Sequence, residues 1–222
     1  MQVVQEAPAR ERATEVAYQR LSDAVIRLEL APGEVLNERG IAARLGVTRL
    51  TMIPALHRLA ETGLIEVLPR RGIVIAPVNV LDVQQVFQAR TVLEGELAAL
   101  TASRATSEQL EWLRSLAQTL DDSAGSGAGF SVFLEHDRRL HLALAQLSGN
   151  RYLYDALERV WKVNLRLWHL FFRQHGTRDS HFLPHSDLIS ALAQADGPGA
   201  RVAMVSHIAA SKELLQLGLW GS

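Results

Sequence analysis

Asp137 and His141 are four residues apart in a stretch with helical periodicity, so we expect both side chains on one face of a helix. Two further histidines, His185 and His207, fall at the start of one expected helix and inside another. Imidazole nitrogens suit zinc, nickel, copper or iron, and a carboxylate can complete the ligand set. If these helices converge, the four side chains would hold a divalent cation and leave coordination positions open.

A plainer interpretation of the same residues stays open. An Asp/His pair at this spacing is usually a surface hydrogen bond, and the eight histidines of the chain could be scattered without sharing a site. His181, four residues before His185, is an alternative ligand by spacing.

Arg90 and Glu94 form a second pair at helical spacing. The plainer interpretation is a surface ion pair, worth about 0.3–0.5 kcal/mol. The functional interpretation is an arginine that turns inward and takes the carboxylate of a ligand in a bidentate fork. Asn164 and Arg166 stand at polar positions of a later helix and are further candidates to line such a cavity.

A basic stretch precedes these residues. Residues 39–71 carry six arginines against two glutamates, although the whole chain has a net charge of −1. Such a local excess can be an electrostatic footprint for nucleic acid, or simply a solvated face. The arginines are Arg39, Arg44, Arg49, Arg58, Arg70 and Arg71.

The elements that surround the basic stretch favour DNA binding. An apolar stripe runs along a first helix that we expect the turn Ala31-Pro32-Gly33 to end, and helices at about 38–45 and 48–61 follow. Aliphatic runs at 64–68 and 73–75 flank the turn 69–72 and predict a hairpin. Three helices followed by a basic-tipped hairpin are typical of a winged helix-turn-helix, in which a helix enters the major groove.

Beyond residue 78 the pattern is helical throughout. We expect a mostly α fold: a winged helix-turn-helix over 10–76, a linker over 77–81 and an all-helical bundle of about six helices over 82–220. The expected helices of this bundle lie at about 82–103, 107–121, 130–148, 150–174, 185–195 and 198–218.

The composition of the chain excludes several classes of protein. Of the 222 residues, 48% are hydrophobic and 21% are charged, which argues against disorder. The chain has no cysteine, which excludes disulfides, thiolate metal sites and cysteine nucleophiles. We find no membrane-spanning apolar run and no signal peptide at the start, so we expect a cytoplasmic protein.

Taken together, these motifs resemble the GntR family of bacterial transcriptional regulators, in its FadR subfamily. The N-terminal part of the resemblance lies in residues 30–36, 45–49, 55–59 and 63–65 and in Arg71-Gly72. The C-terminal part lies in Arg90-xxx-Glu94, Asp137-xxx-His141, Ser148-Gly149-Asn150, His185, Ile189, Ala191-Leu192, Asp196, Ala200, Met204 and His207.

The resemblance implies a homodimer on a palindromic operator and a helical domain that holds a metal, zinc or nickel, with a small carboxylic acid. It assigns the metal to Asp137, His141, His185 and His207, and it points away from the acyl-CoA-binding branch. The positions of this sequence that match the family's DNA contacts are Arg39, Thr48, Arg49, Arg70 and Arg71.

One departure from the family lies in the expected recognition helix. The family usually reads Ser-Arg-Thr-Pro-Val-Arg-Glu-Ala-Leu, whereas residues 48–56 place Ile53 and Pro54 where the second arginine and the glutamate stand. Because proline lacks the N–H that bonds four residues back, we expect a helix that is irregular or starts late between Thr48 and Ala55.

The sequence therefore predicts a metabolite-responsive transcriptional regulator, a repressor by preference, and not an enzyme. Two other functions remain: a ligand sensor with weakened DNA binding, which Ile53 and Pro54 would explain, and a metal-dependent enzyme acting on a small organic acid. The sequence has neither His-Glu-x-x-His nor Gly-x-Ser-x-Gly, which disfavours the enzyme.

Overall fold

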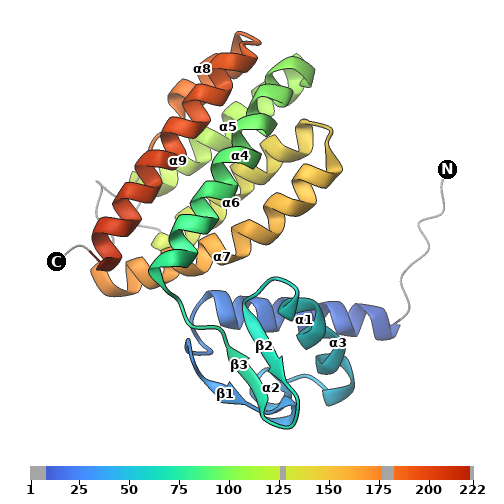
Figure 1. Cartoon of the computed structure of the whole chain (residues 1–222). Coiled ribbons are helices and arrows are strands. Elements are labelled where there is room, and N and C mark those ends of the chain that lie inside the picture. Colours follow the sequence, from blue (N-terminus) through green and yellow to red (C-terminus); the bar gives the residue numbers. More distant parts are fainter. Residues whose placement is uncertain (1–8, 126–128, 177–182, 221–222) are drawn as a thin grey trace. The chain divides into compact units, whose positions relative to one another are not determined.

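The computed structural model describes residues 9–125, 129–176 and 183–220 (Figure 1). The chain forms two compact units that divide between Val78 and Asn79, inside the segment we expected to be a linker.

The first unit combines helices with a three-stranded antiparallel sheet of order β1-β3-β2. Its elements are α1 (Ala9–Ile26), β1 (Val35–Leu36), α2 (Glu38–Arg44), α3 (Arg49–Ala60), β2 (Ile65–Leu68) and β3 (Gly72–Ile75). The predicted winged helix-turn-helix is confirmed, and the hairpin of β2 and β3 is its wing.

The first helix buries the predicted apolar stripe but ends earlier than expected. Ala17, Leu21 and Val25 are fully buried, and α1 packs against α3. It stops at Ile26, before the proline turn, because Leu28 adopts a positive φ of 62° and the N–H of Glu29 donates to the carbonyl of Ala24. This left-handed closure satisfies carbonyls that the helix end would otherwise leave unpaired.

Strand β1 is the element that the sequence did not predict, because two residues carry no periodicity. It pairs with β3 through Val35–Val74 and Leu36–Ile73. Gly72 permits this pairing: its φ is 105°, and a Cβ there would lie 2.5 Å from the carbonyl oxygen of Leu36. A side chain at position 72 would therefore disrupt the wing.

Helix α3 corrects the expectation drawn from Pro54. The helix is continuous from Arg49 to Ala60, and Thr48 caps it by accepting from the N–H of Thr51 at 3.3 Å. Pro54 is exposed, and Leu50, whose carbonyl loses its partner, has a side chain that is 61% exposed. The lost bond therefore faces water, while the buried opposite face holds the helix together.

The second unit is all-helical in its described residues, which confirms the predicted bundle. Its helices are α4 (Val80–Arg104), α5 (Ser107–Gly125), α6 (Phe130–Leu147), α7 (Arg151–His175), α8 (Ser186–Ala193) and α9 (Gly197–Trp220). Helix α4 contacts α6, α7, α8 and α9, as its place among them in Figure 1 shows. A capping box between Asn79 and Asp82 fixes its start. Side chains on the inner face of α4 therefore reach every helix that carries a predicted ligand.

Candidate metal and effector centre

The four predicted metal ligands meet inside the helical unit. Asp137 and His141 come from α6, His185 is the residue before α8, and His207 lies in α9. Each offers one nitrogen or oxygen atom, and these four atoms all lie within 4.8 Å of one another. The alternative of scattered surface histidines is therefore wrong for this set. His181, the alternative ligand by spacing, lies outside the described residues.

The distances within this set suit one ion. Nε2 of His141 lies 3.0 Å from Nε2 of His185, and Oδ1 of Asp137 lies 3.5 Å from both of these nitrogens. Ligand atoms at about 2.1 Å from a tetrahedral ion would be roughly 3.4 Å apart. In addition, Nδ1 of His185 and Nδ1 of His207 are buried without a hydrogen-bond partner among the described residues. Three imidazoles and one carboxylate thus fit a divalent cation of the zinc type.

The charges at the centre are arranged around His141. Burial lowers its pKa, but the carboxylates of Glu94 and Asp137 outweigh burial and raise it to about 9. Burial and the neighbouring His207 lower the pKa of His185 well below its ordinary value, and burial with the charge of His141 lowers that of His207 to about 4. The carboxylates of Glu94 and Asp137 thus bring negative charge next to the three imidazoles, which suits a divalent cation.

Arg90 turns inward, so the surface ion-pair interpretation of Arg90 and Glu94 is wrong. Both side chains are 1% exposed, and Nε of Arg90 donates to Oε1 of Glu94 at 2.5 Å. Nη1 of Arg90 donates to Oδ1 of Asn164 at 3.1 Å, and the guanidinium lies 4.6 Å above the ring of Trp161. Nη2 is buried with no partner among the described residues. One edge of the guanidinium is therefore left for a ligand.

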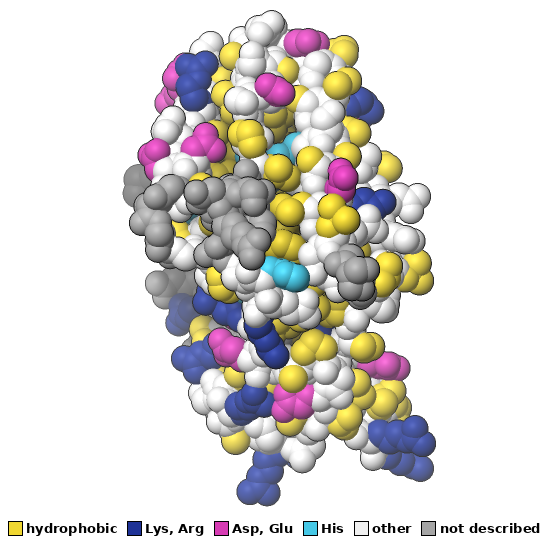
Figure 2. All heavy atoms as spheres, turned by 90° about the vertical axis from the view of Figure 1, so that its left-hand side faces the viewer, with side chains coloured by type: hydrophobic (Ala, Val, Ile, Leu, Met, Phe, Trp, Pro, Cys, Tyr) yellow, Lys and Arg dark blue, Asp and Glu magenta, His cyan; other side chains and the backbone are white. Residues whose placement is uncertain are grey.

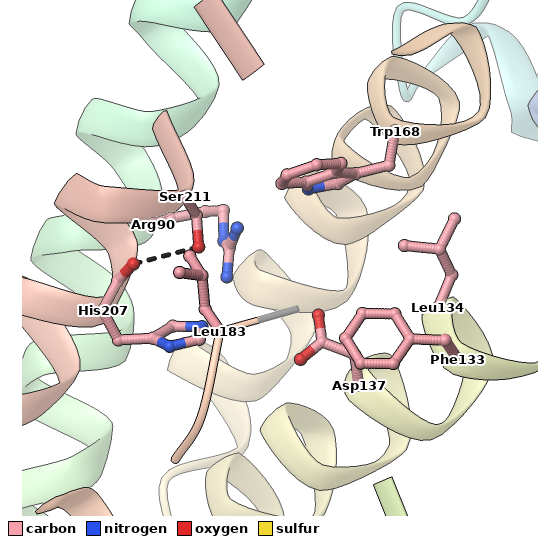
Figure 3. Close-up of a pocket in the computed structure, with 8 residues that line it drawn as sticks. All are labelled: Arg90, Phe133, Leu134, Asp137, Trp168, Leu183, His207 and Ser211. Carbon is pink, nitrogen blue, oxygen red and sulfur yellow. Dashed lines mark hydrogen bonds between the residues drawn. The ribbon is translucent and has the colours of Figure 1, made fainter. Parts of the chain in front are cut away.

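Arg90, Asp137 and His207 line one pocket, as Figure 3 shows. Ser211 closes the same side and donates to the carbonyl of His207 at 2.9 Å. The other lining side chains are apolar: Phe133, Leu134, Trp168 and Leu183. The cavity has a volume of about 20 Å³, which is room for one water-sized group.

The two remaining effector candidates differ. Asn164 is fully buried at the pocket's arginine, and its Nδ2 has no partner in the described part of the chain. Arg166 is also buried, and neither Asn164 nor Arg166 is among the side chains that line the pocket. Burial lowers the pKa of Arg166 to about 10, and the charge of Asp82 opposes this shift. Arg166 thus interacts with the first turn of α4, two turns before Arg90.

Sequence reasoning missed two members of the centre. Glu94 contacts His141 as well as Arg90, and the ring of Trp161 lies 4.9 Å from that of His141. Trp161 precedes Asn164 by three residues, so both lie on one face of α7, and its Nε1 is buried without a partner among the described residues. The three-residue spacing of Trp161 and Asn164 is the signal from which the sequence could have placed Trp161 at the centre. No local pattern in the sequence connects Glu94 to His141.

The predicted DNA-contacting residues lie on the first unit. Arg39, Arg49 and Arg70 line a groove between α2, α3 and the wing, and Arg71 is exposed beside Arg70. Arg49 pairs with Glu38 at 2.8 Å, and Thr48 caps the helix that Arg49 begins. Figure 2 shows dark-blue side chains projecting from this unit, in the lower part of the view, and these are arginines because residues 1–78 contain no lysine. The arrangement places cations along one groove and on the wing tip.

Comparison with known proteins identifies the family. The model described as bacterial regulatory proteins, gntR family, matches residues 13–75, and the model of the FCD domain matches residues 85–210, more than half of the chain. The chain belongs to the GntR family of bacterial regulatory proteins. It is a GntR-family transcriptional regulator with an FCD effector-binding domain. The suspected resemblance is therefore confirmed at the level of the family.

Relatives of this GntR-family regulator are similar over most of their length. It is 27% identical over 193 residues to the HTH-type transcriptional repressor RspR of Escherichia coli K12, covering 86% of this chain and 83% of the relative. It is 30% identical over 221 residues to the Uxu operon transcriptional regulator of the same organism, covering 88% and 83%.

The fold of this GntR-family regulator matches that of E. coli McbR/YncC with a TM-score of 0.79 at 21% identity, covering 91% of this chain and 96% of that one. Among the helices that the structure describes, none combines the length and the apolar composition that a membrane span requires.

Proposed function

We propose that this GntR-family regulator is a metabolite-responsive repressor that binds operator DNA as a homodimer and responds to a small carboxylic acid. The acid would bind at a divalent ion, zinc or nickel, held by Asp137, His141, His185 and His207. The observation that carries this proposal is the convergence of these four ligands beside a buried arginine whose Nη2 has no partner among the described residues. One relative, RspR, is named as a transcriptional repressor, which supports repression rather than activation.

The protein's own groups suit an acid rather than a neutral ligand. Nη2 of Arg90 and Nδ2 of Asn164 are hydrogen-bond donors that lack acceptors among the described residues. A carboxylate supplies acceptors to both, and a divalent ion at the four ligands supplies an open position for one of its oxygens. Arg166, which is buried near the charge of Asp82, stays a further candidate for the same role.

Because the cavity is small, binding of the acid would change the conformation of the side chains around it. A volume of about 20 Å³ does not hold even a three-carbon acid, so binding would displace lining side chains such as Leu183 and Trp168. A ligand shifts an equilibrium only by its different affinity for two states, and displaced side chains provide that difference.

The DNA-binding part of the proposal depends on the arginines of the first unit. Arg39, Arg49, Arg70 and Arg71 are all exposed, and Thr48 fixes the start of the recognition helix. A cation beside a phosphate contributes affinity that falls with salt. The continuous α3 favours a working recognition helix over a degenerate one.

A homodimer is supported by the surface of α4 and α9. Val92 of α4 and Val202 of α9 are 68% and 65% exposed. The two helices approach closely at Gly95, where a Cβ would lie 3.1 Å from Val205, and Arg201 pairs with Glu96 beside it. Val92 and Val202 are thus exposed apolar side chains on two adjoining helices, which a second copy would cover.

Fluorescence anisotropy tests the whole proposal. Metal-loaded protein is titrated onto labelled fragments from the region upstream of its own gene, with and without a panel of small hydroxy, keto and dicarboxylic acids. We expect specific binding that at least one acid changes, and no response to that acid in His207→Ala. An acid that binds to a protein without DNA affinity would favour the degenerate sensor, and turnover of the acid would favour an enzyme.

A further inference from the structure

Glu94 joins the two halves of the centre through its two carboxylate oxygens. Oε1 accepts from Nε of Arg90 at 2.5 Å, and Oε2 accepts from Nδ1 of His141. All three side chains are 1% exposed, so water does not compete for these bonds. Each oxygen of Glu94 thus accepts from a different buried neighbour, one from Arg90 and one from His141.

Only a carboxylate can serve both neighbours. Arg90 and His141 each point an N–H at position 94, and a carboxylate has two oxygens that accept without donating. A glutamine has the same shape but one oxygen and one NH₂ group. It would have to turn a donor toward one of the two donors, and that bond would be lost.

The two bonds fix what the neighbours present to the pocket. With Nδ1 of His141 held by Glu94, the Nε2 side of the ring faces Asp137 and His185. With Nε of Arg90 held by Glu94 and Nη1 held by Asn164, Nη2 has no partner in the part of the chain that the structure describes. Histidine ligands commonly donate their other ring N–H to a carboxylate, which fixes the tautomer and the ring orientation.

We propose that Glu94 is a positioning residue that couples metal binding at His141 to carboxylate binding at Arg90. This inference rests on the proposed function, because it assumes an ion at the four ligands and an acid at Arg90. Since Glu94 orients both groups at once, an ion that orders His141 also orders Arg90 through the same carboxylate. The two ligands therefore raise each other's affinity, and the effect is reciprocal.

The first test compares Glu94→Gln with Glu96→Gln, a matched change of an exposed carboxylate on the same helix. Zinc affinity is measured by competition with a chromophoric chelator. We expect Glu94→Gln to lose about 10–100-fold in zinc affinity, as outer-shell substitutions do, and Glu96→Gln to lose nothing. If the wild type takes up no metal, the proposed function fails and this inference with it. If the wild type and Glu94→Gln bind zinc equally well, this inference alone is overturned.

The second test separates positioning from general support of the fold. In the double variant Arg90→Met with Glu94→Gln, the amide no longer faces the guanidinium and can turn its oxygen to His141. We expect the double variant to recover most of the zinc affinity that Glu94→Gln loses. A double variant that binds zinc as weakly as Glu94→Gln, or more weakly, contradicts the bridging role. That result would mean that each substitution damages the packing of the site and that the two effects add.

A third measurement is made on the wild type, and a variant serves only to assign the signals. Long-range ¹H–¹⁵N spectra of the zinc-loaded protein, assigned by comparison with His141→Gln, report which ring nitrogen of His141 carries the proton. We expect the proton on Nδ1. A proton on Nε2 would place the ion on the nitrogen that Glu94 occupies and would overturn the inference.

Discussion

Nη1 of Arg90 on α4 donates to Oδ1 of Asn164 on α7 at 3.1 Å, inside the bundle and beside the four predicted metal ligands. This bond fixes the plane of the guanidinium across two helices that are 74 residues apart in the chain at this point. Nη2, which has no hydrogen-bond partner among the described residues, is the part of the guanidinium that remains for a ligand, and the predictions on ligand binding depend on it.

Arg90→Lys should weaken binding of a responsive acid about tenfold or more, with little loss of metal. Lysine keeps the charge but cannot reproduce the fork that holds Glu94, Asn164 and a ligand together, and a hydrogen bond to a charged group is worth about 1.5–3 kcal/mol. Calorimetry of the zinc-loaded protein measures the affinity. Arg201→Lys, an exposed arginine on α9, serves as the control. Unchanged affinity in Arg90→Lys would show that the guanidinium does not hold the acid.

His207→Ala should lose most of the metal and the thermal stabilisation that metal provides. A ligand at 100 times its Kd adds about 2.7 kcal/mol to the free energy of unfolding, or roughly 5–10 °C in Tm for a protein of this size. Differential scanning fluorimetry with and without zinc gives the comparison. His175→Ala, an exposed histidine in the same unit, should respond to zinc as the wild type does. A full zinc response in His207→Ala would remove His207 from the ligand set.

Thr48→Ala should destabilise the first unit by about 1 kcal/mol, because it removes the side chain that caps α3. Urea unfolding followed by circular dichroism measures the change. Thr48→Ser keeps the hydroxyl and should restore most of the loss. If the alanine and serine variants unfold alike, the hydroxyl does not set the start of the helix.

Ile53→Arg with Pro54→Glu should tighten DNA binding. The change supplies the cation that the family usually has at this position and restores the N–H that can bond to Leu50. Each new phosphate contact adds about 0.9 to the slope of log affinity against log salt. Pro54→Glu alone is the control, since it restores the N–H without the cation. A double variant that binds no better than the control at any salt concentration would show that Ile53 does not limit affinity.

The sequence predicted those parts of the molecule whose signals are local. Periodic apolar positions predicted the long helices of both units, and the spacing of Asp137 and His141 predicted a shared face. Strand β1 was missed because its two residues owe their pairing to β3. The early end of α1 was missed because Leu28 in a left-handed conformation is an unusual helix terminus.

Tertiary packing decided the rest of the centre. The i,i+4 spacing of Arg90 and Glu94 is the same for an exposed pair and a buried one, and only the contacts of α4 with four other helices make it buried. Glu94 meets His141 across 47 residues of chain, which no local pattern encodes. The continuity of α3 also depends on packing, since the face opposite Pro54 is held against α1.

Native mass spectrometry with elemental analysis of the protein as purified tests the central claim most directly. Wild-type protein and His207→Ala are prepared in parallel, and each is weighed intact and then analysed for zinc, nickel and bound small acids. The account predicts one divalent ion per wild-type chain, accompanied by a small carboxylic acid, and neither in His207→Ala. Wild-type protein that holds no ion even after incubation with zinc and nickel salts would contradict it.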